Sequence, residues 1–429
     1  MKALIIGNGG REHALAWKIE QSPLIKKVFI APGNGGTALE EKVENIDIDS
    51  NDIDQLVLFA KKEAIDLTII GPEVPLSNGI VDVFLENNLK VFGPKKLAAQ
   101  LESSKDFSKI FMERHKIPTA KYKTFINIED AHNYINQEGA PIVIKADGLA
   151  AGKGVVVAMT IDEAIAAVDS MLEDNLFGDA GARVIIEEFL TGEEVSFIVI
   201  CDGDSILPLA SSQDHKRLLN SDLGPNTGGM GAYSPAPIVT SKLHQKIMSE
   251  VIIPTIKGMK KDGIEFTGFL YAGLMIDNQS QIKTLEFNCR MGDPETQPIL
   301  FRLESDFFKI LLAASEKKLG NYKAEWDQGS AITVVIAAKN YPSQPKINDE
   351  IFNLKHTQQD SYIFHAGTNQ KDGKIYTSGG RVLGVTAKGS SLEDAQKKVY
   401  ALINKIKFSG MQYRTDIGQK IIRKNCEKS

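Results

Sequence analysis

Four short apolar segments in the first hundred residues constrain the fold most, because each of them ends in a turn of glycine or proline. They are residues 2–6, 28–31, 67–70 and 91–92, and helical patterns lie between them. Apolar runs that alternate with helices are typical of a parallel sheet covered by helices. The sequence therefore predicts an N-terminal doubly wound α/β domain over residues 1–103.

The turns of this domain carry candidate binding residues. Ligands of such sheets bind at the carboxyl ends of the strands, which places one set of residues along a single rim: Asn8, Gly9, Gly10, Asn34, Gly35 and Glu73. The first turn departs from a dinucleotide-binding fingerprint, because Glu12 stands where the third glycine is required. For each glycine the alternative, that it only shapes a tight turn, stays open.

Residues 141–158 combine two β-branched runs with a glycine-rich loop, which predicts a β-hairpin. The loop is not a Walker motif, because Gly148 and Gly152 are too close and Gly154 stands where a serine or threonine is needed. Backbone N–H groups of such a hairpin can still cover phosphates. Two lysines add positive charge at its ends: Lys145 and Lys153.

A strand near residue 286 gathers side chains suited to phosphate chemistry. Glu286, Asn288 and Arg290 alternate with Leu285 and Phe287, so one face is predicted to be polar and the other apolar. Oxygen ligands suit a hard cation such as Mg²⁺, and a guanidinium can hold a carboxylate or phosphate with two hydrogen bonds. On the same alternation Cys289 falls on the apolar face, so we expect it to pack rather than react.

Two further stretches each have two interpretations: the residues that follow this strand, and a glycine-rich stretch earlier in the chain. Asp293 and Glu295 either contact a substrate, or Asp293 caps a helix that begins at Pro294 while Glu295 complements the helix dipole. The glycine-rich residues 213–233 are predicted to form a long loop between strands, and a loop of this length is usually functional or disordered.

Charge and cysteine usage exclude several classes of protein. The 429 residues include 50 basic and 55 acidic ones, and a net charge of −5 argues against general binding to nucleic acid. Three scattered cysteines indicate neither a disulfide framework nor a zinc site and are typical of a reducing cytoplasm. The sequence also shows no signal peptide and no apolar run of about 18 residues, so we expect no membrane association.

Beyond Trp326 the pattern changes to strands over residues 331–338 and 384–386 and a helix capped by Ser391, which predicts a small C-terminal α+β domain over residues 327–429.

Several long motifs then resemble the ATP-grasp ligases: IKADGLAAGKGV, IIEEFLTGEEVSF, SQDHKR, GPNTGGMGAYSPAP, GFLYAGLMID and EFNCRMGDPETQ. Among these ligases the likeness is to the glycinamide ribonucleotide synthetase family, and it spans the chain from IIGNGGREHALAW to GGRVLGV.

The resemblance implies a fold and a reaction. Residues 104–326 would form the ATP-grasp domain, with a mobile lid subdomain over about 120–192. ATP, glycine and phosphoribosylamine would give glycinamide ribonucleotide, ADP and phosphate through glycyl phosphate. The cofactor would be Mg²⁺ or Mn²⁺. The enzyme would make transient contact with neighbouring purine-pathway enzymes. Two alternatives are another ATP-grasp carboxylate–amine ligase and a nucleotide-binding module without activity.

The resemblance also implies roles for the nucleotide site. Glu187 would take the adenine amino group, the backbone from Glu188 to Leu190 would read the ring, and Glu194 would bind the ribose. Glu286 and Asn288 would hold the metal, without the acid that many ATP-grasp enzymes carry on the paired strand, since residues 271–276 have none. The ATP phosphates would meet two lysines and a flap that covers them: Lys105, Lys145, Gly148, Gly152, Lys153 and Gly154.

The remaining implied roles concern glycine and phosphoribosylamine. Arg290 would pair with the glycine carboxylate and Asp214 with its ammonium, and these two residues with Lys145 would be the catalytic set. Arg381 would meet the 5′-phosphate. The other implied substrate-binding residues are Gly9, Gly10, Glu73, Gly229, Asp293 and Glu295.

Overall fold

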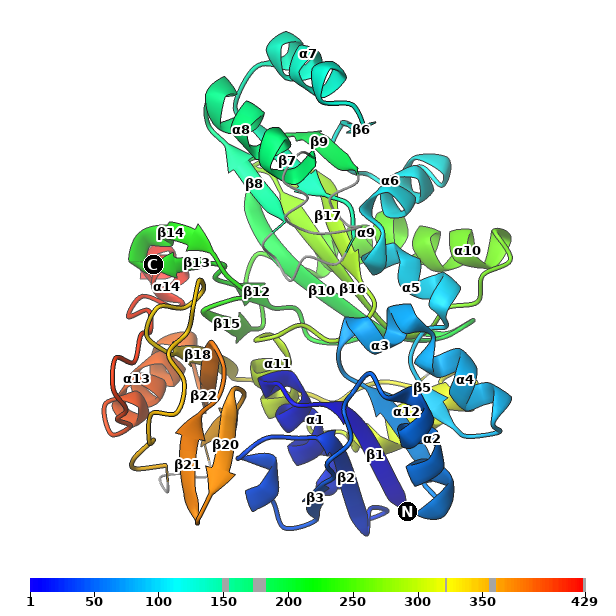
Figure 1. The fold of residues 1–429 in the computed structure, drawn as a ribbon, viewed down its shortest axis with the longest axis vertical. Helices are drawn as coiled ribbons and strands as arrows, with labels where there is room; N and C mark the ends of the chain where they lie inside the picture. The colour runs from blue at the N-terminus through cyan, green and yellow to red at the C-terminus, as the bar shows by residue number, and fades with distance from the viewer. Residues whose placement is uncertain (149–153, 173–182, 321, 355–359, 427–429) are drawn as a thin grey trace.

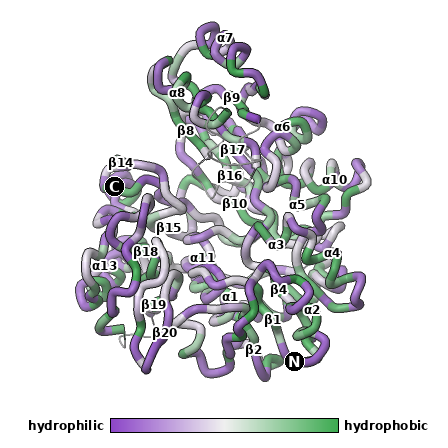
Figure 2. Tube along the Cα trace, in the orientation of Figure 1, coloured by the Kyte–Doolittle hydropathy of each residue, from purple (hydrophilic) through white to green (hydrophobic). Residues whose placement is uncertain are grey.

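The computed structural model describes residues 1–148, 154–172, 183–320, 322–354 and 360–426 (Figure 1). In Figure 1 a lid subdomain stands at the top, the N-terminal domain lies at the lower right and the C-terminal domain at the lower left. Hydrophobic residues gather in inner strands such as β1 (Lys2–Gly7), whereas the outer helix α7 (Ile128–Glu138) is mostly hydrophilic (Figure 2). None of the described helices is long and apolar enough to cross a membrane.

The N-terminal domain is a five-stranded parallel sheet in the order β3-β2-β1-β4-β5, so the predicted doubly wound domain is confirmed. The prediction missed β3, because this strand has only three residues and one of them is buried, which leaves no apolar run to recognise. The bounds of the other elements are β2 (Lys27–Pro32), β3 (Val43–Asn45), β4 (Leu67–Ile70), β5 (Val91–Phe92), α1 (Gly10–Glu20), α2 (Ile53–Lys62), α3 (Glu73–Asn78) and α4 (Ile80–Glu86).

The lid subdomain is a four-stranded antiparallel sheet in the order β6-β9-β7-β8, and two helices pack on it. It has a separate apolar core, to which both helices and all four strands contribute. The predicted hairpin is present as β7 and β8. The bounds are β6 (Tyr122–Phe125), β7 (Ile142–Ala146), β8 (Val155–Ala158), β9 (Val184–Glu188) and α8 (Ile161–Leu172).

A second four-stranded antiparallel sheet, in the order β11-β10-β16-β17, forms the centre of the molecule. Its apolar residues join those of the N-terminal domain in continuous cores, which fixes the two parts against each other. The bounds are β10 (Glu193–Asp202), β11 (Ile206–Pro208), β16 (Thr267–Ile276), β17 (Ile282–Asn288), α5 (Lys96–Ser103), α6 (Lys105–Arg114), α9 (Ser241–Ile247), a π-helical turn (Met248–Ile252), α10 (Ile253–Lys261), α11 (Thr296–Arg302) and α12 (Phe307–Ser315).

The stretch 213–233 is not the long loop that the sequence predicts. It contains four short strands, and two of them, β12 (Gln213–Asp214) and β15 (Gly231–Ser234), extend the sheet of the C-terminal domain in the order β12-β15-β18-β22-β19. These strands escape detection because each has only two to four residues, and because β15 also pairs with the distant residues 331–334. The remaining bounds are β13 (Arg217–Leu219), β14 (Leu223–Asn226), β18 (Ser330–Ala337), β19 (Ser361–His365), β20 (Thr368–Lys371), β21 (Lys374–Thr377), β22 (Arg381–Gly389), α13 (Leu392–Ile403) and α14 (Gln419–Cys426).

Candidate active site

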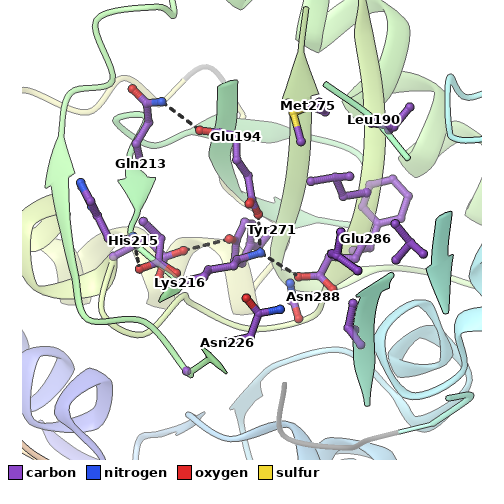
Figure 3. Close-up of a pocket in the computed structure, with 18 of the residues that line it drawn as sticks. Leu190, Glu194, Gln213, His215, Lys216, Asn226, Tyr271, Met275, Glu286 and Asn288 are labelled. Atoms are coloured by element: carbon purple, nitrogen blue, oxygen red, sulfur yellow. Dashed lines mark hydrogen bonds and ion pairs between the residues drawn. The ribbon is translucent and has the colours of Figure 1, made fainter. Parts of the chain in front are cut away.

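A cavity of about 690 Å³ opens where the lid, the central sheet and both terminal domains meet, and part of its lining is drawn in Figure 3. Candidates from all of these parts of the chain line it together, although they are dispersed in the sequence. These residues are Glu73, Lys105, Lys145, Gly148, Gly154, Glu187, Glu188, Leu190, Glu194, Asp214, Glu286, Asn288, Arg290, Asp293, Glu295 and Arg381.

Three candidate glycines, among them Gly10, lie beside this lining rather than in it. A Cβ atom at Gly9 would lie 3.4 Å from Asp293 Oδ2, and one at Gly229 would lie 2.7 Å from Asp214 Oδ1. Because these contacts leave little or no room for a side chain, the glycines let the backbone approach two acidic lining residues. Two further candidates lie outside the described residues: Gly152 and Lys153.

Glu187 is buried between two ammonium groups. Its carboxylate oxygens lie 2.9 Å from Lys145 Nζ on β7 and 2.9 Å from Lys109 Nζ on α6. Burial lowers the pKa of Lys109 to about 8, although the pair with Glu187 opposes this shift. Glu187 therefore joins the lid to α6 with a single carboxylate at the wall of the cavity. The neighbouring Glu188 turns its side chain away, toward the backbone N–H of Lys121 at 2.9 Å.

Helix α6 begins at the cavity and holds Lys105 against the hairpin. Ser104 is its N-cap and accepts a hydrogen bond from Phe107 N at 3.1 Å. Lys105 Nζ donates to the carbonyl of Gly148 at 2.6 Å. Burial lowers the pKa of Lys105 while the carboxylate of Glu286 opposes the shift. The ammonium thus lies where the glycine loop leaves β7.

Strand β17 places Glu286 and Asn288 in the cavity lining, but simple alternation does not describe it. The register with β16 shifts between Gly273 and Leu274, so that Leu285 is an extra residue in a β-bulge. Leu285 therefore lies half-buried at the cavity next to Glu286, whereas Phe287, which also reaches the lining, is buried in the apolar core. The predicted common apolar face of Leu285 and Phe287 is wrong for this reason.

Glu286 lies among positive side chains. Burial raises the pKa of Glu286, but the ammonium groups of Lys216, Lys145 and Lys105 outweigh burial and lower it overall. Lys216 Nζ lies 3.8 Å from Glu286 Oε1 and also forms an ion pair with Glu194 (Figure 3). The carboxylate is thus ionised and available to a cation.

Arg290 is held by two carboxylates from the N-terminal part of the chain. Its Nη2 lies 3.0 Å from Glu102 Oε1, and its Nε lies 3.4 Å from Glu73 Oε2 without hydrogen-bond geometry. Nη2 also donates to Asn288 Oδ1 at 3.2 Å. The Nε–H is therefore a buried donor at the cavity with no hydrogen-bond acceptor, which suits an incoming carboxylate.

Asp293 does not cap a helix, so that interpretation is wrong. Helix α11 begins at Thr296, its N-cap position is Glu295, and no side chain makes the capping hydrogen bond. Asp293 instead lies 3.2 Å from Arg381 Nη2, and Arg381 Nη1 donates to the carbonyl of Asp293 at 2.6 Å and to that of Gly228. Arg381 thus connects the C-terminal domain to the cavity.

Glu295 is a buried acceptor that packs against the central sheet from the N-cap position of α11, where it can still complement the dipole of that helix. Its Oε1 accepts from Ser196 Oγ at 2.9 Å and from Tyr271 Oη at 2.8 Å. Burial and the nearby charge of Glu295 raise the pKa of Asp214 well above its ordinary value. Asp214 therefore has reason to bind a positive group or a proton. Cys289 is buried, and burial raises the pKa of its thiol, as expected for a packing residue.

Several charged residues that the structure places in or beside the cavity have no role that the sequence predicts. Lys109 and Glu102 are single charged residues on helices, where a lysine or glutamate is ordinary at the surface, so nothing local marks them. Lys216 stands in the SQDHKR motif, and this motif is the sequence signal that could have marked it as a site residue. The rim candidate Asn34, by contrast, joins loops, since its Oδ1 accepts from Gly36 N at 2.8 Å and its Nδ2 donates to the carbonyls of Asn8 and His365, both at 2.9 Å.

The donor set fits a magnesium ion that is shared with a ligand. Among the described residues no group of three or more His, Cys, Asp or Glu side chains could hold a metal. Glu286 and Asn288 supply two oxygen ligands at the cavity, and Mg²⁺ commonly binds one or two protein oxygens and completes its octahedron with phosphates and water.

Three family models match the chain in sequence order. The N domain of phosphoribosylglycinamide synthetase matches residues 1–102, its ATP-grasp (A) domain residues 103–296 and its C domain residues 331–420. The chain belongs to the phosphoribosylglycinamide synthetase family. The family and fold class that the sequence predicts, and the class of ATP-grasp ligase, are confirmed.

Relatives of known name support the same family. The chain is 58% identical over 424 residues to phosphoribosylamine–glycine ligase of Ralstonia nicotianae, covering 99% of this chain and 100% of the relative. It is 56% identical over 429 residues to the enzyme of that name from Vibrio parahaemolyticus, with full coverage of both.

Solved structures extend the comparison to the fold. The crystal structure of phosphoribosylamine–glycine ligase from Thermotoga maritima has a TM-score of 0.83 at 34% identity, covering 97% of this chain and all of that one. A biotin carboxylase domain from Hydrogenobacter thermophilus has a TM-score of 0.75 over 96% of this chain and 91% of its own. At 15% identity this second likeness concerns the fold alone.

Proposed function

We propose that the chain joins glycine to phosphoribosylamine with ATP, through glycyl phosphate, and releases glycinamide ribonucleotide, ADP and phosphate. The observation that carries the proposal is the combination in one cavity of lysines for phosphates, an oxygen pair for a metal and a guanidinium for a carboxylate. An ATP-grasp ligase for another acid and a module without activity are the alternatives, and no structural observation favours either.

The first step needs ATP and glycine side by side. Lys105 and Lys145 would hold the phosphates, while residues of the lid edge and the central sheet would hold adenine and ribose: Glu187, Glu188, Leu190 and Glu194. Mg²⁺ or Mn²⁺ on Glu286 and Asn288 would offset phosphate charge.

Arg290 would orient the glycine carboxylate through the Nε–H that lacks an acceptor. A carboxylate oxygen then attacks the γ-phosphorus, the bond from that phosphorus to the β-phosphate oxygen breaks, and ADP leaves.

In the second step the amine of phosphoribosylamine attacks the acyl carbon of glycyl phosphate, and phosphate leaves with the bonding electrons. Asp214 would hold the glycine ammonium, because its buried carboxyl gains from a positive partner. Arg381 would meet the 5′-phosphate. The remaining proposed contacts of the amine substrate are Gly9, Gly10, Glu73, Gly229, Asp293 and Glu295.

The proposal also includes a division into three domains, over residues 1–103, 104–326 and 327–429. It further includes a cytoplasmic location and transient contact with neighbouring purine-pathway enzymes. The sheet that joins β15 to β18 crosses the last of these boundaries, so residues 231–234 fold with the C-terminal domain. Limited proteolysis would test the ranges, because cleavage is expected in segments between cores rather than within this sheet.

A coupled assay of ADP release tests the reaction. Turnover is expected only with both glycine and phosphoribosylamine, and ADP release with another carboxylic acid in place of glycine would contradict the proposal. In Glu286→Ala, glycine-dependent ADP formation should be lost, since one of the two metal ligands is gone. Near-normal turnover in that variant would contradict the metal assignment, and Lys283→Ala, at a half-exposed position of the same strand, is the matched control.

A further inference from the structure

Lys216 lies between two carboxylates to which the proposed function gives different ligands. Its Nζ forms an ion pair with Glu194 on β10, the proposed ribose residue, and lies 3.8 Å from Oε1 of Glu286 on β17, the proposed metal ligand. Figure 3 shows the ammonium in the middle of the cavity with one carboxylate on either side. No role for Lys216 follows from the reaction steps above.

The sheet explains why one ammonium can serve both acids. Strand β16 runs between β10 and β17, with Met275 opposite Glu194 and Gly273 opposite Glu286. Neighbouring strands are about 4.8 Å apart, so the two carboxylates approach each other across β16. Gly273 has no side chain to separate them. Without a cation between them the two negative charges would repel each other.

The hairpin beside the cavity fixes the backbone of Lys216, whereas its side chain is held only through ion pairs at the ammonium group. Its carbonyl accepts hydrogen bonds from Thr227 N and from Thr227 Oγ1, both at 2.8 Å. The side chain itself is 35% exposed. A lysine on such a fixed base can exchange one anionic partner for another without a change in the fold.

We propose that Lys216 is a positioning residue that compensates the charges of Glu194 and Glu286 before ligands bind and releases Glu286 to the metal when nucleotide binds. The inference rests on the proposed roles of Glu194 and Glu286. It has two opposite consequences. A metal ion without nucleotide must compete with the ammonium for Glu286. A nucleotide without metal benefits from the ammonium, because its phosphates would otherwise meet two uncompensated carboxylates.

The test measures the two ligands separately in Lys216→Met, which keeps most of the length of the side chain and removes the charge. Mn²⁺ binding without nucleotide, followed by electron paramagnetic resonance, should tighten about tenfold, and ADP binding in EDTA, followed by calorimetry, should weaken about tenfold. Such factors are reasonable for one unit charge near 4 Å at a half-exposed site. Lys216→Arg retains the charge and should keep both affinities near those of the wild type.

Opposite shifts distinguish this role from a structural one. If both ligands bind more weakly in Lys216→Met, or if neither affinity changes, the inference is overturned. Absence of Mn²⁺ binding in both the wild type and Lys216→Met overturns it as well. Lys216→Gln provides a second uncharged variant if Lys216→Met unfolds. Failure of the proposed function appears elsewhere, as wild-type protein without glycine-dependent ADP release, so the two outcomes can be told apart.

Discussion

Replacement of Glu187 by glutamine should destabilise the protein in a manner that depends on pH. Glu187 is 2% exposed, and it is the shared partner of Lys109 and Lys145, which are 3% and 8% exposed. Removal of one partner of a buried ion pair typically costs about 3–5 kcal/mol, because an uncompensated charge stays buried. We expect a loss of that size in the free energy of unfolding at pH 6.

The pH dependence follows from Lys109, whose pKa burial lowers from 10.5 to about 8 in the wild type. In Glu187→Gln this pKa falls further, so between pH 6 and pH 8 the folded variant binds fewer protons than the folded wild type. The variant then gains stability relative to the wild type as pH rises, by about 1.4 kcal/mol per pH unit. Well above pH 8, from about pH 9, folded Lys109 is mostly neutral in both proteins, and the difference should approach a constant value.

Urea denaturation at several pH values between 6 and 9 measures this difference. Glu188→Gln is the control, because Glu188 is the neighbouring carboxylate with one exposed lysine partner, Lys283. Its change should stay below about 1 kcal/mol at every pH. Lys109→Met in the Glu187→Gln background should remove the slope between pH 6 and pH 8. A penalty for Glu187→Gln that does not vary across this window would refute the reasoning.

Three further predictions concern ligands and reactivity. Arg290→Ala should raise the KM for glycine by about 10- to 100-fold, the worth of a charge-assisted hydrogen bond to a carboxylate, and an equal rise for ATP in steady-state kinetics would contradict the role. Arg381→Met should raise the KM for phosphoribosylamine while that for ATP changes little, and unchanged amine kinetics would exclude a phosphate contact. Cys289→Ala should retain kcat, since the thiol is buried and its pKa is raised, and loss of turnover in a folded variant would show otherwise.

Local pattern was enough to predict the parts of the fold whose apolar residues are contiguous. The strands β1, β2, β4 and β5 were found because each is a buried run that ends in a turn. Strands such as β12 and β15 were not found, because they have only two and four residues and because β15 pairs with β18, far along the chain. Their backbone hydrogen bonds are satisfied by tertiary structure, which no local periodicity records.

The same distinction holds for the cavity. Glu286 and Asn288 could be predicted because they stand two residues apart on one strand. The bulge at Leu285 could not, since it depends on the register with β16. The partners of Arg290 were also hidden, because Glu73 and Glu102 come from helices about 200 residues away in the sequence. Long motifs identified the positions that matter, whereas the structure shows which charges meet.

The pairing of charges in the cavity has a consequence for substrate binding. Cations of the cavity are already close to carboxylates. Arg290 pairs with Glu102 and Glu73, Lys216 pairs with Glu194 and Glu286, and Arg381 pairs with Asp293. An anionic substrate that reaches one of these cations therefore replaces or shares an existing carboxylate. Its net gain is the difference between two ion pairs, which is smaller than the strength of either.

A carboxylate displaced from its cation needs a new positive partner. A metal ion that arrives with ATP can supply one at Glu286, and it then leaves Lys216 free for phosphate. The charges that would meet glycine and those that would meet the nucleotide belong to one connected set. Glu286 and Arg290 lie on the same segment, and Asn288 accepts a hydrogen bond from Arg290. We therefore expect the affinity for glycine to depend on whether the metal–nucleotide complex is bound, since each exchange removes part of the cost of the next.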